Sequence, residues 1–149
     1  MPSKLFTEGK LIIYTDGGAR GNPGPAAIGF LIGEKKYGEA IGETTNNVAE
    51  YKAVLAALKK AKHLLGKKNA KQTDLEIRGD SELIYKQMLG KYKILEPDLQ
   101  KLFIEIWNLK QDFKSAEFKK IPREENKAAD RMVNQALDGK LKSGQKKLL

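Results

Sequence analysis

The chain has 149 residues, the size of one domain and long enough to bury a core without cross-links. It has no cysteine, which excludes disulfides, thiolate metal sites and a thiol nucleophile. Its one histidine, His63, excludes a multi-histidine zinc site and disfavours a Ser-His-Asp hydrolase. No apolar run approaches the ~18 residues of a membrane span, and the first ten residues lack the apolar core of a signal peptide. We therefore expect a cytoplasmic protein with no membrane partner.

The charge is the first positive indication of function. Lysine and arginine total 28 against 19 acids, a formal net charge of +9. Such an excess favours a polyanionic partner, nucleic acid before a membrane surface. The alternative is a lysine-rich surface that serves only solubility. Residues 140–149 contain lysines and no acid, so we expect a single domain over residues 1–139 followed by a flexible basic tail.

The first third of the chain predicts three strands. Leu11–Thr15 is a short β-branched run, and Ala26–Ile32 and Tyr37–Glu43 follow it. Turns rich in glycine and proline separate them, at residues 20–25 and 33–36. Two short connections in a row indicate an antiparallel meander.

The rest of the chain alternates helices with two further strands. The predicted helices are Val48–Leu65, a short one from Ser81 to about Leu89, one opening at Pro97 and extending toward Phe113, and Asn126–Leu137. The predicted strands are Asp74–Arg78 and Glu117–Ile121. Strands separated by helices favour parallel pairing. The sequence therefore predicts an α/β fold with one mixed five-stranded sheet, strands four and five parallel to strand one, and helices on both faces.

Four acids stand at the ends of these elements. Asp16 follows the first predicted strand and Asp80 the fourth, so parallel pairing brings their carboxylates side by side. Glu50 lies one turn into the first long helix and Asp130 in the first turn of the last, both among small apolar residues. Clustered carboxylates repel one another and need a counter-charge, and hard divalent cations such as Mg²⁺ supply it. Two such ions held by bridging carboxylates make a phosphoryl-transfer site.

Each acid also has a purely structural interpretation. Asp16-Gly17 is a common turn, an aspartate before a helix is usually a cap, and Asp130 in a first turn stabilises the helix dipole. The structural interpretation is weaker for the four together, because they stand at the ends of elements that must converge.

Four segments then resemble the motifs of type 1 ribonuclease H, in the same order and over most of the chain from about Lys10 to Leu137. They are Asp16–Ala26 (DGGARGNPGPA), Thr44–Tyr51 (TTNNVAEY), Arg78–Ser81 (RGDS) and Pro122–Asp130 (PREENKAAD). The resemblance implies a ribonuclease H fold and cleavage of the RNA strand of RNA–DNA hybrids, giving 5′-phosphate and 3′-hydroxyl ends. It also implies that Asp16, Glu50, Asp80 and Asp130 bind two Mg²⁺ or Mn²⁺ ions.

Further matched positions imply contacts with the hybrid. Asn22, Asn46 and Asn47 correspond to family residues near the minor groove, where amides distinguish RNA by its 2′-hydroxyls. Gly17 and Gly18 match glycines that let the backbone approach the RNA strand. Two more residues match positions facing the DNA strand: Thr45 in a phosphate pocket and Tyr92 against a sugar. The asparagines before the helix also have a simpler interpretation as caps.

The sequence departs from many family members in three respects. The loop before Asp130 contains no histidine, and Arg123 or Glu124 is the nearest replacement; Arg123 could also be an ordinary surface arginine. His63 lies among lysines far from the motifs, so we expect it to be exposed and not catalytic. The link over residues 90–97 is too short for a lysine-rich handle, and too few residues precede the first strand for an N-terminal hybrid-binding domain.

Two other functions share this fold. One is a nuclease acting on DNA or junctions, as in integrases and resolvases, which usually lack the Thr-Thr-Asn-Asn motif. The other is a catalytically inactive hybrid-binding module, which the presence of all four acids disfavours. We expect a monomer whose tail adds affinity for nucleic acid.

Overall fold

The computed structural model describes residues 6–7 and 9–139. Its strands are β1 (Phe6–Thr7), β2 (Lys10–Ala19), β3 (Gly24–Ile32), β4 (Lys35–Thr44), β5 (Asp74–Gly79) and β6 (Ser115–Lys120). Its helices are α1 (Asn46–Leu65), α2 (Lys67–Ala70), α3 (Glu82–Met88), α4 (Pro97–Lys110), the 3₁₀ turn η1 (Arg123–Glu125) and α5 (Lys127–Leu137). The predicted basic tail lies outside the described residues.

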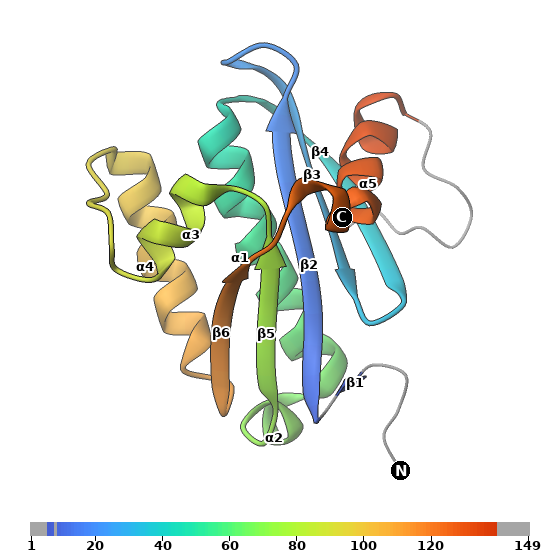
Figure 1. The fold of residues 1–149 in the computed structure, drawn as a ribbon, viewed down its shortest axis with the longest axis vertical. Coiled ribbons are helices and arrows are strands. Elements are labelled where there is room, and N and C mark those ends of the chain that lie inside the picture. The colour runs from blue at the N-terminus through green and yellow to red at the C-terminus, as the bar shows by residue number, and fades with distance from the viewer. Residues whose placement is uncertain (1–5, 8, 140–149) are drawn as a thin grey trace.

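One mixed sheet organises the molecule, in the strand order β4-β3-β2-β5-β6 (Figure 1). The meander β2-β3-β4 is antiparallel, whereas β5 pairs parallel to β2 and β6 parallel to β5. The two-residue strand β1 adds a short antiparallel pairing at the start of β2. This confirms the predicted five-stranded fold. The sequence did not predict β1 or α2, because two and four residues carry too little periodicity to be recognised.

Helices cover both faces of the sheet. Helix α1 packs against β2 and β3 on one face, with α4 alongside it, and α5 packs against β3 and β4 on the other (Figure 1). The main core lies between the sheet and α1, and its largest fully buried side chains include Phe30, Tyr51, Leu58, Leu75 and Ile77. No helix within the described ranges is long and apolar enough to cross a membrane.

The first strand is longer than predicted, and this corrects the position of Asp16. Strand β2 continues to Ala19 because β3 keeps pairing with it, with Asp16 opposite Gly29. Its pairing with β5 ends earlier, at Tyr14 and Arg78. Asp16 is therefore inside β2, just beyond its last residue paired with β5. The reasoning that brings it close to Asp80 still holds, because Asp80 directly follows β5.

The start of α1 also differs from the prediction. The cap is Thr45, whose hydroxyl accepts a hydrogen bond of 3.2 Å from the N–H of Val48, and Asn46 and Asn47 already belong to the helix. The Asn46 side chain accepts instead from the N–H of Ala19 at 2.8 Å. At the other end, Gly66 ends the helix as predicted, with φ of 82° and an N–H bonded to the carbonyl of Lys62.

Candidate active site

Three carboxylates converge where β2, β5 and α1 meet. Asp16 comes from β2, Asp80 from the residue after β5 and Glu50 from the second turn of α1. One carboxylate oxygen from each lies within 4.8 Å of those of the other two. The parallel pairing of β2 with β5 brings two of these acids together, and the packing of α1 on β2 adds the third. Three carboxylate oxygens at this spacing form a set of ligands suited to a hard divalent cation.

A close approach between β2 and α1 holds Glu50 in the cluster. The backbone N–H of Gly17 donates a 2.6 Å hydrogen bond to Oε1 of Glu50. A Cβ atom at Gly17 would lie 2.3 Å from the carbonyl oxygen of Ala49, so only glycine allows this approach. At Gly18 the nearest heavy atom to such a Cβ would be 3.9 Å away. Because Gly17 has no side chain, α1 can pack directly against β2 at this point. The sequence alone did not reveal this role of Gly17.

The cluster favours protonation in the absence of a cation. Burial, together with the negative charges of Glu50, Asp80 and Asp130, raises the pKa of Asp16 to about 9. Burial also raises the pKa of Glu50 to about 7, against the opposing effect of its hydrogen bond from Gly17. At neutral pH protons therefore compete with a metal ion for these two carboxyl groups. A divalent cation would displace these protons and offset the repulsion between the carboxylates, so this set of ligands fits the metal ions that the sequence predicts.

Asp130 joins the cluster from the opposite side, on the first turn of α5. It lines one crevice of about 410 Å³ with Asp16, Glu50 and Asp80, and its negative charge contributes to the raised pKa of Asp16. Asp130 is exposed, although its neighbours in the sequence are small apolar residues. The buried face of α5 is formed by Ala129, Met132, Val133 and Ala136, which leaves Asp130 on the solvent side of the helix.

Most of the other predicted site residues surround this crevice. Gly17, Gly18, Asn46, Asn47 and Arg123 are among its lining residues. Asn22 and Thr45 do not line it, but each is bonded to the start of α1: the Asn22 side-chain oxygen accepts from the N–H of Asn46 at 3.0 Å, and Thr45 is the helix cap.

Arg123 extends from η1 toward the acids. Its Nε lies 3.8 Å from Oδ2 of Asp80, while its side chain is 90% exposed. This cation is therefore next to the carboxylate cluster, and most of its side chain is open to solvent. The neighbouring Glu124 is exposed and does not line the crevice.

Two predicted residues lie away from the acids. Tyr92 is on the link between α3 and α4, 46% exposed, and its hydroxyl accepts a hydrogen bond of 3.1 Å from Nζ of Lys86, which also sits over its ring. His63 is exposed near the C-terminal end of α1, as predicted, and is not part of the crevice.

Sequence reasoning missed several residues of the site. Ser81 was predicted only as the start of a short helix and as part of the third motif, yet it also lines the crevice. Asn134 lines it as well, and its spacing of four residues from Asp130 could have indicated this, because residues i and i+4 share a helix face. Beneath the acids, the buried hydroxyl of Tyr85 lies 3.3 Å from that of Thr15.

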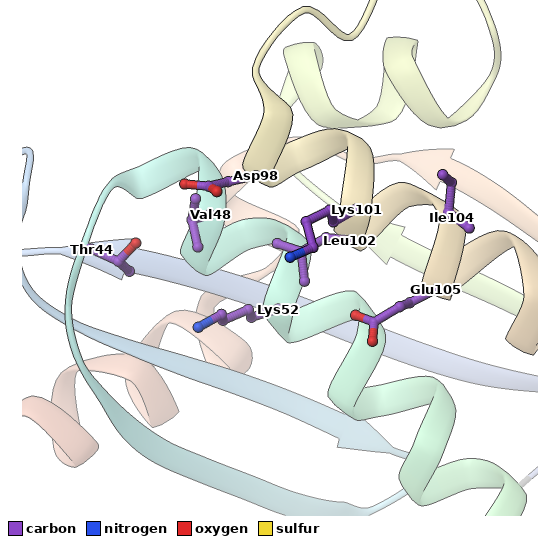
Figure 2. Close-up of a pocket in the computed structure, with 8 residues that line it drawn as sticks. All are labelled: Thr44, Val48, Lys52, Asp98, Lys101, Leu102, Ile104 and Glu105. Atoms are coloured by element: carbon purple, nitrogen blue, oxygen red, sulfur yellow. The ribbon is translucent and has the colours of Figure 1, made fainter.

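A larger hollow, of about 640 Å³, lies between α1 and α4 (Figure 2). Two lysines, Lys52 and Lys101, and two acids, Asp98 and Glu105, contribute to its lining. Their charges balance, and the four catalytic candidates line a different crevice. The smaller crevice is thus the candidate active site, because it alone of the two gathers carboxylates with raised pKa values.

Comparison with known proteins agrees with this fold and site. The reverse transcriptase-like family matches residues 15–136. A protein named ribonuclease HI from Halobacterium salinarum is 38% identical over 136 residues, which is 87% of this chain and 65% of that protein. A bifunctional protein of Mycobacterium tuberculosis is 37% identical over 141 residues. The matched region is 90% of this chain but only 37% of the length of the Mycobacterium protein.

Solved structures give the same result. The crystal structure of ribonuclease H1 from Halobacterium salinarum superposes with a TM-score of 0.80 at 38% identity, covering 88% of this chain and 99% of that one. The crystal structure of LC11-RNase H1 in complex with an RNA/DNA hybrid has a TM-score of 0.80 at 46% identity, with the same coverages of 88% and 99%. The fold and the acids thus define a reverse transcriptase-like protein, and within that class the chain belongs to the type 1 ribonuclease H family.

Proposed function

We propose that the protein is a metal-dependent endoribonuclease that hydrolyses the RNA strand of RNA–DNA hybrids. The observation that carries this proposal is the convergence of Asp16, Glu50, Asp80 and Asp130 on one crevice of a ribonuclease H fold. The hybrid bound by LC11-RNase H1, a structure 46% identical to this chain, supports the same substrate class here.

The four acids would hold two Mg²⁺ or Mn²⁺ ions once the hybrid is bound. Bound ions supply two things to phosphodiester hydrolysis: a water of lowered pKa and charge that offsets the leaving oxygen. The expected products carry a 5′-phosphate and a 3′-hydroxyl. Such chemistry needs no side-chain nucleophile, in keeping with a chain that has no cysteine.

The chain's own residues would orient the scissile phosphate. The Gly17 N–H holds the Glu50 carboxylate in place, and Ser81 and Asp130 line the same crevice. Arg123 is the exposed cation next to the acids, placed to bind a phosphate oxygen or to support the leaving group.

The asparagines supply donors for the minor groove. The side-chain oxygens of Asn22 and Asn46 are both bonded to backbone N–H groups, so the amide NH₂ groups are the parts left to face a ligand. An NH₂ donor suits the oxygen of a 2′-hydroxyl. We assign the same surface to Asn47 and Gly18, while Thr45 and Tyr92 would contact the DNA strand.

The remaining binding energy would come from dispersed lysines. Lys86 contacts Tyr92, and Lys91 and Lys93 are its neighbours in the sequence on the link between α3 and α4. We propose that the tail over residues 140–149 adds sequence-independent affinity for the phosphate backbone. We further propose that the protein acts as a cytoplasmic monomer.

One cleavage assay tests the proposal. The full chain is incubated with end-labelled RNA–DNA hybrid, duplex RNA and duplex DNA, each with Mg²⁺, with Mn²⁺ and with a chelator. Cleavage of the RNA strand of the hybrid alone, only with metal, is expected. Preference for duplex DNA would instead indicate a nuclease of the integrase or resolvase kind, and binding without cleavage would indicate an inactive module.

Asp80→Asn is the matching variant. It keeps the shape of the side chain but removes a ligand charge, so metal-dependent cleavage should fall at least ~1,000-fold with the fold intact. Glu34→Gln, an equivalent change on the exposed turn between β3 and β4, should leave the rate unchanged. Full activity of Asp80→Asn would remove this acid from the site.

A further inference from the structure

Arg20 bridges two segments that lie 118 positions apart in the chain. It stands at the end of β2, on the turn that leads to β3, and it lines the crevice. Its Nη1 donates to Oδ1 of Asp138 at 2.7 Å, and its Nη2 donates to Oδ1 of Asn134 at 3.3 Å. One guanidinium therefore ties the β2–β3 turn to the C-terminal part of α5.

The contact continues from Arg20 toward the fourth acid. Asn134 accepts from Arg20 with its oxygen and donates with its Nδ2 to the backbone carbonyl of Asp130 at 3.1 Å. The other end of α5 is bonded to β2 as well, because Nδ2 of the buried Asn126 donates to the carbonyl of Thr15 at 2.9 Å. Asp130 thus lies between two points at which α5 is held: Asn126, bonded to β2, and Asn134 with Asp138, bonded to Arg20 on the turn after β2.

The turn that carries Arg20 also supports the start of α1. Ala19, the residue before Arg20, donates its N–H to the Asn46 side chain, and Asn22 accepts from the N–H of Asn46. The N–H of Arg20 closes the turn by bonding the carbonyl of Pro25 at 2.8 Å. A displacement of this turn would therefore reach the asparagines on one side and α5 on the other.

We propose that Arg20 is a positioning residue for the proposed hybrid cleavage, fastening the turn that carries Asn22 to the helix that carries Asp130. This inference rests on the proposed function, because it concerns the same crevice. Half-exposed ion pairs of this kind add little to stability, so the contribution of Arg20 lies in geometry. A small displacement of a metal-binding carboxylate slows the chemical step far more than it weakens substrate binding.

The test compares Arg20→Ala, Asp138→Ala and the double variant in the full chain. Arg20→Ala should lower kcat about tenfold with a much smaller change in KM. Asp138→Ala should also lower kcat, and the double variant should be no slower than the slower of the two single variants, because both changes break the connection between Arg20 and Asp138. Arg20→Lys should recover part of the rate, since an ammonium reaches one acceptor but does not fit both. Arg131→Ala, an exposed arginine on the same helix, is the matched control.

A different pattern would overturn the proposal. If Arg20 binds a phosphate of the hybrid directly, Arg20→Ala raises KM, and Asp138→Ala lowers it by releasing the arginine. Amide hydrogen exchange separates these outcomes from a failure of the proposed function, because it needs no substrate. Arg20→Ala should speed exchange in the β2–β3 turn and in the last turn of α5, whether or not the protein cleaves hybrids. Unchanged exchange in both segments would refute the positioning role.

Discussion

The backbone N–H of Gly17 donates a 2.6 Å hydrogen bond to the Glu50 carboxylate, across the contact between β2 and α1. The same contact brings the carbonyl of Ala49 to where a side chain on Gly17 would stand. Glycine at this position therefore sets both the distance between the strand and the helix and the place of one acid in the crevice.

Gly17→Ala should damage stability and activity together. The new Cβ would lie 2.3 Å from the Ala49 carbonyl oxygen and 2.7 Å from the Glu50 nitrogen, so β2 and α1 must separate. Overpacking of this kind costs on the order of 1–3 kcal/mol in the free energy of unfolding. Urea unfolding and the hybrid assay measure the two effects. Gly18→Ala is the control: a Cβ there has 3.9 Å of space, so the free energy of unfolding should change little.

The stability of the metal-free protein should fall as the pH rises. The pKa of Asp16 is raised by burial to about 9 and that of Glu50 to about 7, so the folded chain holds protons that the unfolded chain releases near pH 4. The unfolded state therefore binds fewer protons between those values, and the free energy of unfolding decreases with pH across this window. Thermal unfolding in chelator between pH 5 and pH 9 shows this as a falling melting temperature.

Asp16→Asn should flatten that dependence. It removes one of the repelling charges and should stabilise the metal-free protein at pH 8 on the order of 1–2 kcal/mol, while abolishing cleavage. Adding Mg²⁺ to the unaltered protein should restore stability at high pH, because the ion replaces the protons. A melting temperature that rises from pH 5 to pH 9 in chelator would contradict the repulsion described for the cluster.

Arg123→Ala should slow cleavage without weakening the fold. The side chain is 90% exposed and, among the described residues, its one ion pair is with Asp80 at 3.8 Å, so its effect on the free energy of unfolding should stay below about 0.5 kcal/mol. Loss of a cation beside the scissile phosphate should lower kcat by about tenfold. Arg123→Lys should keep more of the rate. Equal rates for Arg123→Ala and the unaltered chain would make this an ordinary surface arginine.

Removing residues 140–149 should weaken hybrid binding in a salt-dependent way. The tail holds Lys140, Lys142, Lys146 and Lys147. Each lysine that neutralises a phosphate contributes about 0.7–0.9 to the slope of log K against log salt, so truncation after Gly139 should reduce the magnitude of that slope by up to about 3.6. Binding is measured between 50 and 200 mM salt for the full-length and truncated chains, both carrying Asp80→Asn so that the hybrid is not cleaved during the measurement. A tail that makes no phosphate contact leaves the slope as it was.

The sequence was sufficient to predict the antiparallel meander, the parallel direction of the last two strands and the convergence of four acids on one crevice. Short turns rich in glycine and proline marked the meander, and the change to helical spacing after Thr45 marked the crossover that makes β5 parallel to β2. Once that pairing was expected, Asp16 and Asp80 had to be neighbours. Such local patterns predict the fold correctly because the intrinsic preferences of these segments and their packing in the folded protein favour the same secondary structure.

Other features depend on tertiary contacts that no local pattern records. The length of β2 is set by its pairing with β3, so a glycine pair that reads as a turn continues the strand instead. The exposure of Asp130 follows from the face that α5 turns toward β3. The ion pair of Arg20 with Asp138 joins positions 118 residues apart, and each residue taken alone reads as an ordinary surface charge.

The attachment of α5 also has a consequence during synthesis of the protein. Asp16, Glu50 and Asp80 all precede residue 81, whereas Asp130 belongs to the last helix of the described chain. A nascent chain on the ribosome could assemble the first three acids but would lack the wall that α5 provides. Under the proposed function, hybrid cleavage would thus begin only when α5 has docked, so a chain truncated before α5 would not cleave hybrids.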